Sequence, residues 1–158
     1  MLDIEIRSKL RNLPNFLGVF ARDTLPAKVN IFPHSLIANT DEHDEAGTHW
    51  IGIYVDEVGR GDYFDSYALG PLFHEFIAYL ERNCKAGFSW NRIPLQCTTC
   101  VTCGEYCCAY LILRTAGKTH DDFMKLFTNN RNTNDYIIKS IFKVLNPNDD
   151  DGEDEVDN

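Results

Sequence analysis

An apolar segment, residues 103–116, constrains the fold of this 158-residue chain more than any other feature. Nearly every position in the segment is apolar, and a helix that is apolar around its whole circumference is buried on all sides. Gly117 follows at a position typical of a C-terminal helix cap. No apolar run in the chain approaches the roughly 20 residues of a membrane span. We therefore expect a single domain whose other elements enclose a central helix.

The rest of the chain predicts short strands and amphipathic helices around that helix. Residues 49–55 and 62–65 are rich in aromatic and β-branched side chains and flank a turn, so we expect two antiparallel strands. A third short strand is expected over residues 91–96. Pro33 restricts any strand within residues 29–39 to an edge or a broken strand. Apolar residues at helical spacing predict helices at residues 3–13, 70–84, 119–127 and 133–145.

Charge is distributed unevenly along the chain, whose formal net charge is −9. Residues 149–158 include seven acidic and no basic residues, which leaves 17 acidic and 15 basic residues in the remainder. We expect residues 1–148 to form one nearly neutral domain and the acidic tail to be disordered and solvated. The chain lacks the dense basic face of a nucleic-acid binder, so weak nucleic-acid binding at most is expected.

The cysteines are clustered rather than spread along the chain. Five of the six lie between Cys97 and Cys108. The first residues lack the apolar stretch of a secretory signal, so we expect an intracellular or virion-borne protein that is not secreted and has no membrane partner. Clustered cysteines in such a protein indicate reduced thiols, a metal site or catalysis rather than a disulfide framework.

Cys103 stands where a polar run meets the apolar helix. A helix N-terminus favours an anion, and the thiolate is the nucleophilic form of cysteine. Gly104 follows, so the backbone at that point can approach a substrate closely. Considered alone, Cys103 reads as an ordinary buried thiol.

Three polar residues could supply the partners of a cysteine nucleophile. His49, at the start of a predicted strand, can face a cleft and accept the thiol proton. Asp65, at the end of the next strand, can orient the imidazole. Gln96, at the end of the third predicted strand, can join the backbone N–H of Cys103 in an oxyanion hole. Taken singly, each of the three reads as an ordinary surface residue, and Trp50 reads equally as a cleft wall or as core.

The cysteine spacing also allows a metal or cluster site. The run Cys97-x2-Cys100-x2-Cys103-x3-Cys107 reproduces one ferredoxin spacing. However, Cys108 rather than proline follows the fourth cysteine, and there is no second cysteine group. Zinc needs four converging ligands, whereas Cys107 is predicted to point into the core. We therefore expect no bound metal and keep a cysteine-ligated metal protein as a lower alternative.

The order His49, Asp65, Gln96, Cys103 resembles the adenovirus-type protease family, adenain, and in particular its versions in Polinton/Maverick elements and related DNA viruses. SUMO- and ubiquitin-like-protein proteases have the same order and share the fold. The resemblance covers about residues 16–116. Its motifs are Gly47-Thr-His-Trp50, Tyr63-Phe-Asp-Ser66 with Gly70-Pro71, and Cys103-Gly104 with Cys107-Cys108.

The resemblance implies an α+β, papain-like cysteine protease fold of rearranged order, with a small mixed sheet packed on the nucleophile helix. It implies His49, Asp65 and Cys103 as the triad and Gln96 as the oxyanion residue. The implied activity is endopeptidase cleavage after small residues such as glycine, through an acyl-enzyme intermediate. The implied role is maturation of viral capsid or precursor proteins, in the host nucleus or cytoplasm and in the virion.

Further expectations concern binding. Trp50 and Gly104 are the expected substrate contacts. No cofactor is expected to be required, although the family is stimulated by a peptide and by DNA. Cys84 is the one isolated cysteine that could bind such an activator, and the charge distribution gives DNA stimulation no support. Removal of ubiquitin-like modifiers is the alternative activity, and a non-catalytic binding module with this fold is a further alternative.

Overall fold

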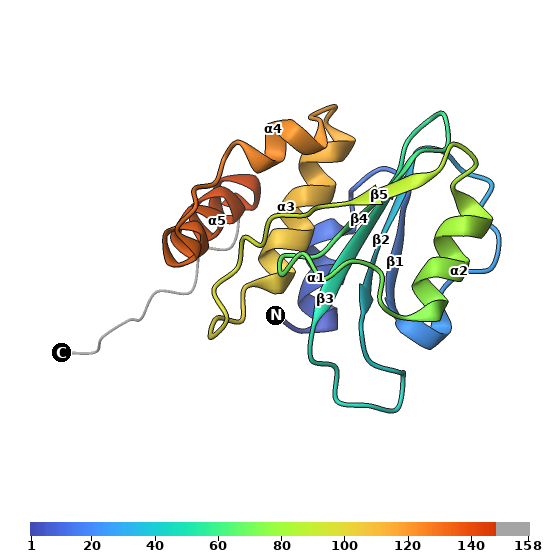
Figure 1. The fold of residues 1–158 in the computed structure, drawn as a ribbon, viewed down its shortest axis with the longest axis horizontal. Helices are drawn as coiled ribbons and strands as arrows, with labels where there is room; N and C mark the ends of the chain where they lie inside the picture. The colour runs from blue at the N-terminus through green and yellow to red at the C-terminus, as the bar shows by residue number, and fades with distance from the viewer. Residues whose placement is uncertain (148–158) are drawn as a thin grey trace.

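A mixed five-stranded sheet forms the centre of the computed structural model, which describes residues 1–147 (Figure 1). The outer pairs, β1–β2 and β4–β5, are parallel, and the two inner pairs are antiparallel. The strands lie side by side in chain order: β1 (Phe16–Ala21), β2 (His34–Asn39), β3 (Trp50–Val55), β4 (Gly61–Phe64) and β5 (Phe88–Trp90).

Helices cover both faces of the sheet (Figure 1). They are α1 (Asp3–Leu10), α2 (His74–Asn83), α3 (Cys103–Thr115), α4 (His120–Met124) and α5 (Arg131–Leu145), with a short 3-10 turn at Arg22–Thr24. α2 lies alone on one face, whereas α1 and α3 lie on the other and α4 and α5 pack against α3. The predicted α+β architecture, a small mixed sheet packed on a central helix, is confirmed.

Both faces of the sheet are core. In β2, Leu36 belongs to the buried cluster under α2, and the next residue, Ile37, belongs to the cluster under α3. Ile53 and Tyr54 of β3 divide between the two clusters in the same way. Strands buried on both faces are apolar at nearly every position, which is why their sequences alternate only weakly.

α3 is the buried helix that the apolar segment predicts, and it runs along β3. Its first turns lie beside the start of β3, where the Cys107 thiol donates to the Trp50 carbonyl at 3.4 Å. Further along, α3 packs so close to the strand that a Cβ at Gly52 would lie 3.6 Å from Leu111. This packing sets Cys103, the first residue of α3, beside the start of β3.

One strand prediction is wrong: residues 91–96 form a loop rather than a strand, because Pro94 has no N–H and the N–H groups of Leu95 and Gln96 donate to the Ser66 carbonyl. Of the two alternatives for residues 29–39, a broken strand is the one observed: β2 begins after Pro33 and lies inside the sheet, between β1 and β3, rather than at its edge. Pro33 comes immediately before the first residue of β2, so its missing N–H removes no hydrogen bond from the ladder.

The helix predictions hold with changed bounds: α5 begins at residue 131 rather than 133, and the other helices are shorter than predicted. Both C-terminal helices are present as α4 and α5, whereas α2 begins at His74 instead of residue 70. Gly70 has a positive φ of 73°, and its carbonyl accepts the Leu72 N–H, so a turn precedes α2. None of the helices within residues 1–147 is long and apolar enough to cross a membrane. The predicted acidic tail, residues 149–158, lies outside the described residues.

Candidate active site

His49 and Asp65 meet at one end of the sheet. β3 and β4 are antiparallel, with Gly52 opposite Phe64, so the residue before β3 and the residue after β4 lie close together. His49 Nε2 lies 2.7 Å from Asp65 Oδ1. The Asp65 side chain is 3% exposed and that of His49 is 13% exposed, so this ion pair is shielded from water. The structure therefore brings together the predicted base and its orienter.

Two residues that the sequence analysis missed hold this pair in place. Asn91 binds the backbone of Asp65 on both sides: its Oδ1 accepts the Asp65 N–H at 3.0 Å, and its Nδ2 donates to the Asp65 carbonyl at 2.7 Å. The Tyr67 N–H donates to Asp65 Oδ1 at 2.8 Å, and the Tyr67 ring lies 4.9 Å from the His49 ring. Asn91 and Tyr67 thus fix the carboxylate and cover the imidazole.

Cys103 lies at an N-terminus of α3 that has no side-chain cap. Thr102 occupies the N-cap position, but its hydroxyl donates to Asp135 Oδ1 of α5 at 2.7 Å and does not accept from the helix. The first N–H groups of a helix have no intrahelical partner and carry partial positive charge. Because the Thr102 hydroxyl binds Asp135 instead of capping the helix, the first N–H groups of α3 stay available to an anion beside Cys103.

The His49–Cys103 pair favours the charged form of both side chains. Burial raises the pKa of the Cys103 thiol, but the hydrogen bond and charge of His49, with backbone hydrogen bonds from Trp50 and Gly104, bring that pKa below its usual value. Burial lowers the pKa of His49, whereas hydrogen bonds to Asp65 and to Cys103 raise it to about 9. Since Nε2 faces Asp65, the other ring nitrogen is the one left for the thiol. These opposite shifts of the two pKa values favour a thiolate–imidazolium pair over the neutral pair.

Gln96 is only 1% exposed, and hydrogen bonds hold both ends of its side-chain amide. Its Oε1 accepts from the Ser66 hydroxyl at 2.6 Å, and its Nε2 donates to the Cys100 carbonyl at 2.6 Å. Arg131 of α5 donates to the Gln96 carbonyl. The Ser66 bond fixes the NH2 group on the side of residues 97–102, which lead to Cys103. One N–H of that group is engaged by Cys100 and the second is the one an oxyanion could use.

The predicted substrate contacts, Trp50 and Gly104, both adjoin Met1. The Trp50 indole Nε1 donates to the Met1 carbonyl at 3.0 Å. A Cβ at Gly104 would lie 2.8 Å from Met1 Cβ, so the close approach that this glycine permits is made here by Met1. A role for Trp50 and Gly104 in binding substrate stays a prediction.

The ferredoxin-like cysteine set does not assemble. Among the described residues, the group that could hold a metal ion is Cys97, Cys100 and Asp135, whose ligand atoms lie within 4.8 Å of one another. Neither Cys103 nor Cys107 belongs to it. Three ligands are fewer than the four of a structural zinc site.

Cys84 is poorly suited to bind an activator through its thiol. It is buried at the end of α2 against Gly61, where a Cβ would lie 2.3 Å from its sulfur. Burial raises the pKa of Cys84 to about 12. A thiol with so little thiolate exchanges slowly with disulfides, so the structure gives no support to this candidate.

Comparison with known proteins shows the fold. No protein-family model and no curated protein matches the chain. The ASFV pS273R protease superposes with a TM-score of 0.60 at 16% identity, over 89% of this chain and 65% of that one. Two further structures superpose less well. The central domain of the uncharacterized Lpg1148 protein from Legionella pneumophila has a TM-score of 0.49 at 14% identity, over 92% of this chain and 98% of that one. The SUMO protease Ulp1 has a TM-score of 0.37 at 16% identity, over 70% of this chain and 54% of that one. The chain therefore has the fold of the ASFV protease, of whose length it spans just under two thirds.

Proposed function

We propose that this chain is a cysteine endopeptidase in which Cys103 is the nucleophile, His49 the general base, Asp65 its orienter and Gln96 an oxyanion donor. The observation that carries the proposal is the His49 geometry: one ring nitrogen lies 2.7 Å from the Asp65 carboxylate, beside Cys103 at a helix N-terminus, and the interaction with Cys103 raises the pKa of His49 and lowers that of Cys103. The cysteine-protease fold of a solved relative supports it.

Each residue has a step in the proposed reaction. The Cys103 thiolate attacks the scissile carbonyl carbon, and the carbonyl π electrons move to oxygen. The backbone N–H of Cys103 and the free N–H of Gln96 bind that oxyanion. The His49 imidazolium, steadied by Asp65, protonates the leaving amine as the acyl-enzyme forms. His49 then takes a proton from water as that water attacks the thioester carbonyl. The acid product is released, Cys103 leaves as a thiolate, and the thiolate–imidazolium pair is restored.

The proposed substrates are precursor polypeptides of a virus or virus-like element, cut after a small residue such as glycine. The resemblance to adenovirus-type proteases and the shared fold with the ASFV protease support this choice. We expect the Tyr67 ring, which lies 4.9 Å from the His49 ring, and the half-buried Trp50 to narrow the approach to Cys103 and so to disfavour a bulky side chain before the scissile bond.

A matched substrate panel tests the proposal. We expect a fluorogenic peptide with glycine before the scissile bond to be cleaved at least about tenfold faster in kcat/KM than one with leucine at that position. A folded ubiquitin-like domain ending in glycine and fused to a reporter forms the third substrate. Preference for the fusion would reassign the substrate to ubiquitin-like modifiers. Absence of cleavage of all three by the folded, reduced chain would contradict the proposal.

The pH dependence of cleavage should be bell-shaped, with an alkaline limb near pH 9. Cleavage needs His49 protonated and Cys103 deprotonated, so it falls as pH rises through the His49 pKa of about 9 and as pH falls through the lowered Cys103 pKa. Asp65→Asn removes a charge that raises the His49 pKa, so the alkaline limb should move to lower pH by about 1–3 units.

The matched control for that substitution is Asp44→Asn, which removes one negative charge from an exposed loop residue. Its pH–rate profile should coincide with that of the unaltered chain. An Asp65→Asn variant with an unmoved alkaline limb would show that Asp65 does not act on His49.

A further inference from the structure

Residues 97–100, between Gln96 and the nucleophile helix, form a turn that brings two thiols together. The Cys100 N–H donates to the Cys97 carbonyl at 3.3 Å, which closes the turn. The Cys97 and Cys100 sulfurs lie within 4.8 Å of each other, and both cysteines are free. Two cysteines separated by two residues in such a turn can be bridged with little movement of the backbone.

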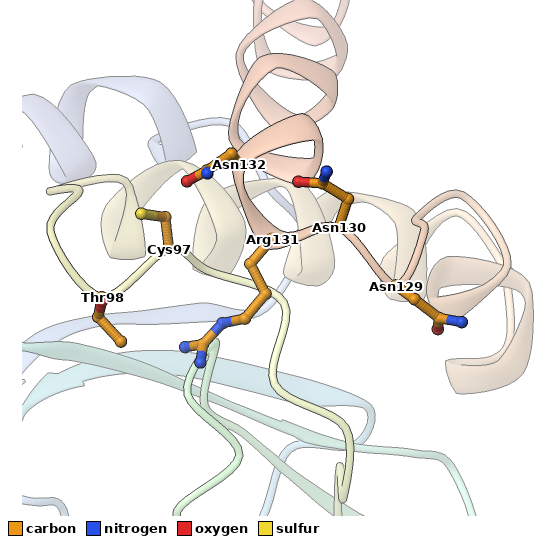
Figure 2. A pocket seen from close by; sticks show the side chains of 6 residues that line it. All are labelled: Cys97, Thr98, Asn129, Asn130, Arg131 and Asn132. Carbon is orange, nitrogen blue, oxygen red and sulfur yellow. The ribbon is translucent and has the colours of Figure 1, made fainter.

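The Cys97 thiol is accessible to small molecules. It lines an open pocket of about 600 Å³ between this turn and the start of α5, with Thr98 on the same side and residues 129–132 on the other. In Figure 2 Cys97 and Thr98 project from the loop, and Arg131 extends from α5 towards it. The pocket is lined by asparagine and threonine side chains and the Arg131 cation. The positive charge of Arg131 attracts carboxylates, so the pocket suits a polar reagent that carries them.

Asp135 favours a thiol pair over a metal ion at this turn. Both of its carboxylate oxygens already accept hydrogen bonds, Oδ2 from the Cys97 N–H at 2.9 Å and Oδ1 from the Thr102 hydroxyl at 2.7 Å. A metal would compete for these oxygens and would still lack a fourth protein ligand. Thr99 Oγ1 lies 3.3 Å from Cys97 Sγ, within hydrogen-bonding reach of a thiolate.

We propose that Cys97 and Cys100 form a reversible disulfide by exchange with a small disulfide such as oxidised glutathione. The Cys97 thiolate attacks one glutathione sulfur, and the other glutathione leaves as a thiolate. The Cys100 thiol has a pKa that Cys97 and Asp135 raise to about 11, and the effect of a charged Cys97 ends once Cys97 is in the mixed disulfide. Cys100 then loses its proton and attacks the Cys97 sulfur, and the second glutathione leaves as a thiolate. The two protons released by the cysteines are taken up by the two glutathione thiolates, so two protein thiols are oxidised and one disulfide is reduced.

The consequence for catalysis rests on the proposed function. The Cys100 carbonyl accepts the Gln96 Nε2–H at 2.6 Å and lies 3.5 Å from the Tyr67 hydroxyl. A disulfide changes the position of this carbonyl, and the hydrogen bond to it sets the direction of the second Gln96 N–H. Because even a small change turns that second N–H away from the oxyanion, the oxidised form should have a lower kcat with little change in KM.

The experiment equilibrates the full chain in buffers of oxidised and reduced glutathione, quenches it with acid and maps its disulfides by mass spectrometry. We expect a Cys97–Cys100 bridge, reversed by excess reduced glutathione, with kcat lowered about fivefold or more in the oxidised form. Cys97→Ser should keep the kcat of the reduced chain, and in oxidised glutathione it should lose only the part of its kcat that modification of Cys103, followed in the same mass spectra, accounts for. Cys84→Ser, which changes a buried cysteine away from the turn, should respond as the unaltered chain does.

Each other outcome is decisive. A stable mixed disulfide on Cys97, or a bridge from Cys97 to Cys103, would overturn the proposed pair. Stoichiometric zinc that binds the reduced chain and blocks oxidation would replace it with a metal site. If the bridge formed and kcat did not change, the proposed disulfide would be supported and the proposed effect of that disulfide on catalysis would be wrong. Disulfide mapping needs no activity, so a reduced chain without peptidase activity would count against the proposed function alone.

Discussion

Cys103→Ala should abolish peptide cleavage, lowering kcat by on the order of 10⁴-fold or more. In the proposed mechanism the substitution removes the sulfur that forms the acyl-enzyme bond, so the oxyanion donors have no tetrahedral intermediate to stabilise. It deletes one sulfur at the cleft end of α3, where the residue is still 8% exposed, so the helix and its packing should survive. Circular dichroism and the thermal midpoint would verify folding, and kcat would be measured on the glycine peptide.

Cys108→Ala is the matched control, because it removes a fully buried thiol from the same helix. This variant should lose stability through a small cavity and keep its kcat. If Cys103→Ala retained normal cleavage, the assignment of the nucleophile would be wrong. If both variants lost cleavage together with their folded structure, damage to α3 would be the cause.

Thiol labelling is a second test of the Cys103 assignment, but Cys97 should be labelled as well. Cys97 is also reactive, because hydrogen bonds with Thr99 lower its pKa on an exposed turn. A small alkylating reagent should therefore modify both cysteines. A peptide-like electrophile, which must first occupy the cleft, should select Cys103 and should react more slowly in His49→Ala.

Gln96→Ala should lower kcat by on the order of 10²–10³, about 3–4 kcal/mol of transition-state stabilisation. The amide N–H donates to an oxygen whose charge develops only during the reaction, so KM should change less than kcat. Gln96→Glu should be worse than Gln96→Ala, because it sets an anion beside that oxygen and beside the Cys100 carbonyl. Steady-state kinetics on the glycine peptide would measure both variants.

Stability must be separated from catalysis at this position, since Gln96 is buried and hydrogen-bonded at both ends of its amide. Losing those bonds should cost about 1–3 kcal/mol of the free energy of unfolding. Ser66→Ala is the control: it removes the partner of Gln96 Oε1 and leaves the donor in place. A kcat loss in Ser66→Ala as large as in Gln96→Ala would show that Gln96 acts only through the local structure.

The sequence was sufficient to predict the helix that begins at Cys103 and the two strands next to His49 and Asp65, for local reasons. An all-apolar run after a polar one predicts a buried helix with Cys103 at its start, and α3 confirms it. Two short strands around a tight turn must be antiparallel, and their ends bring His49 next to Asp65. Both inferences use only the period of a strand or helix and the length of a connection.

Contacts distant in sequence could not be predicted in this way. Residues 91–96 read as a strand because their propensities are suitable, but the Ser66 carbonyl takes the hydrogen bonds that a strand would need. Asn91 is one polar residue in a loop, and nothing in its neighbourhood indicates that it clamps the backbone of Asp65. Asp135 lies on a helix outside the resemblance, and its role depends on how α5 packs.

That packing determines how much of the chain a working catalytic unit requires. The proposed catalytic residues all precede Gly117, yet the segment that joins Gln96 to Cys103 is anchored on α5. Arg131 binds the Gln96 carbonyl, and Asp135 binds the Cys97 N–H and the Thr102 hydroxyl. A fragment ending at Gly117 would contain every reactive group and would release that segment. We therefore expect an active fragment to extend through α5, and substitutions at Arg131 or Asp135 to lower the rate of the chemical step.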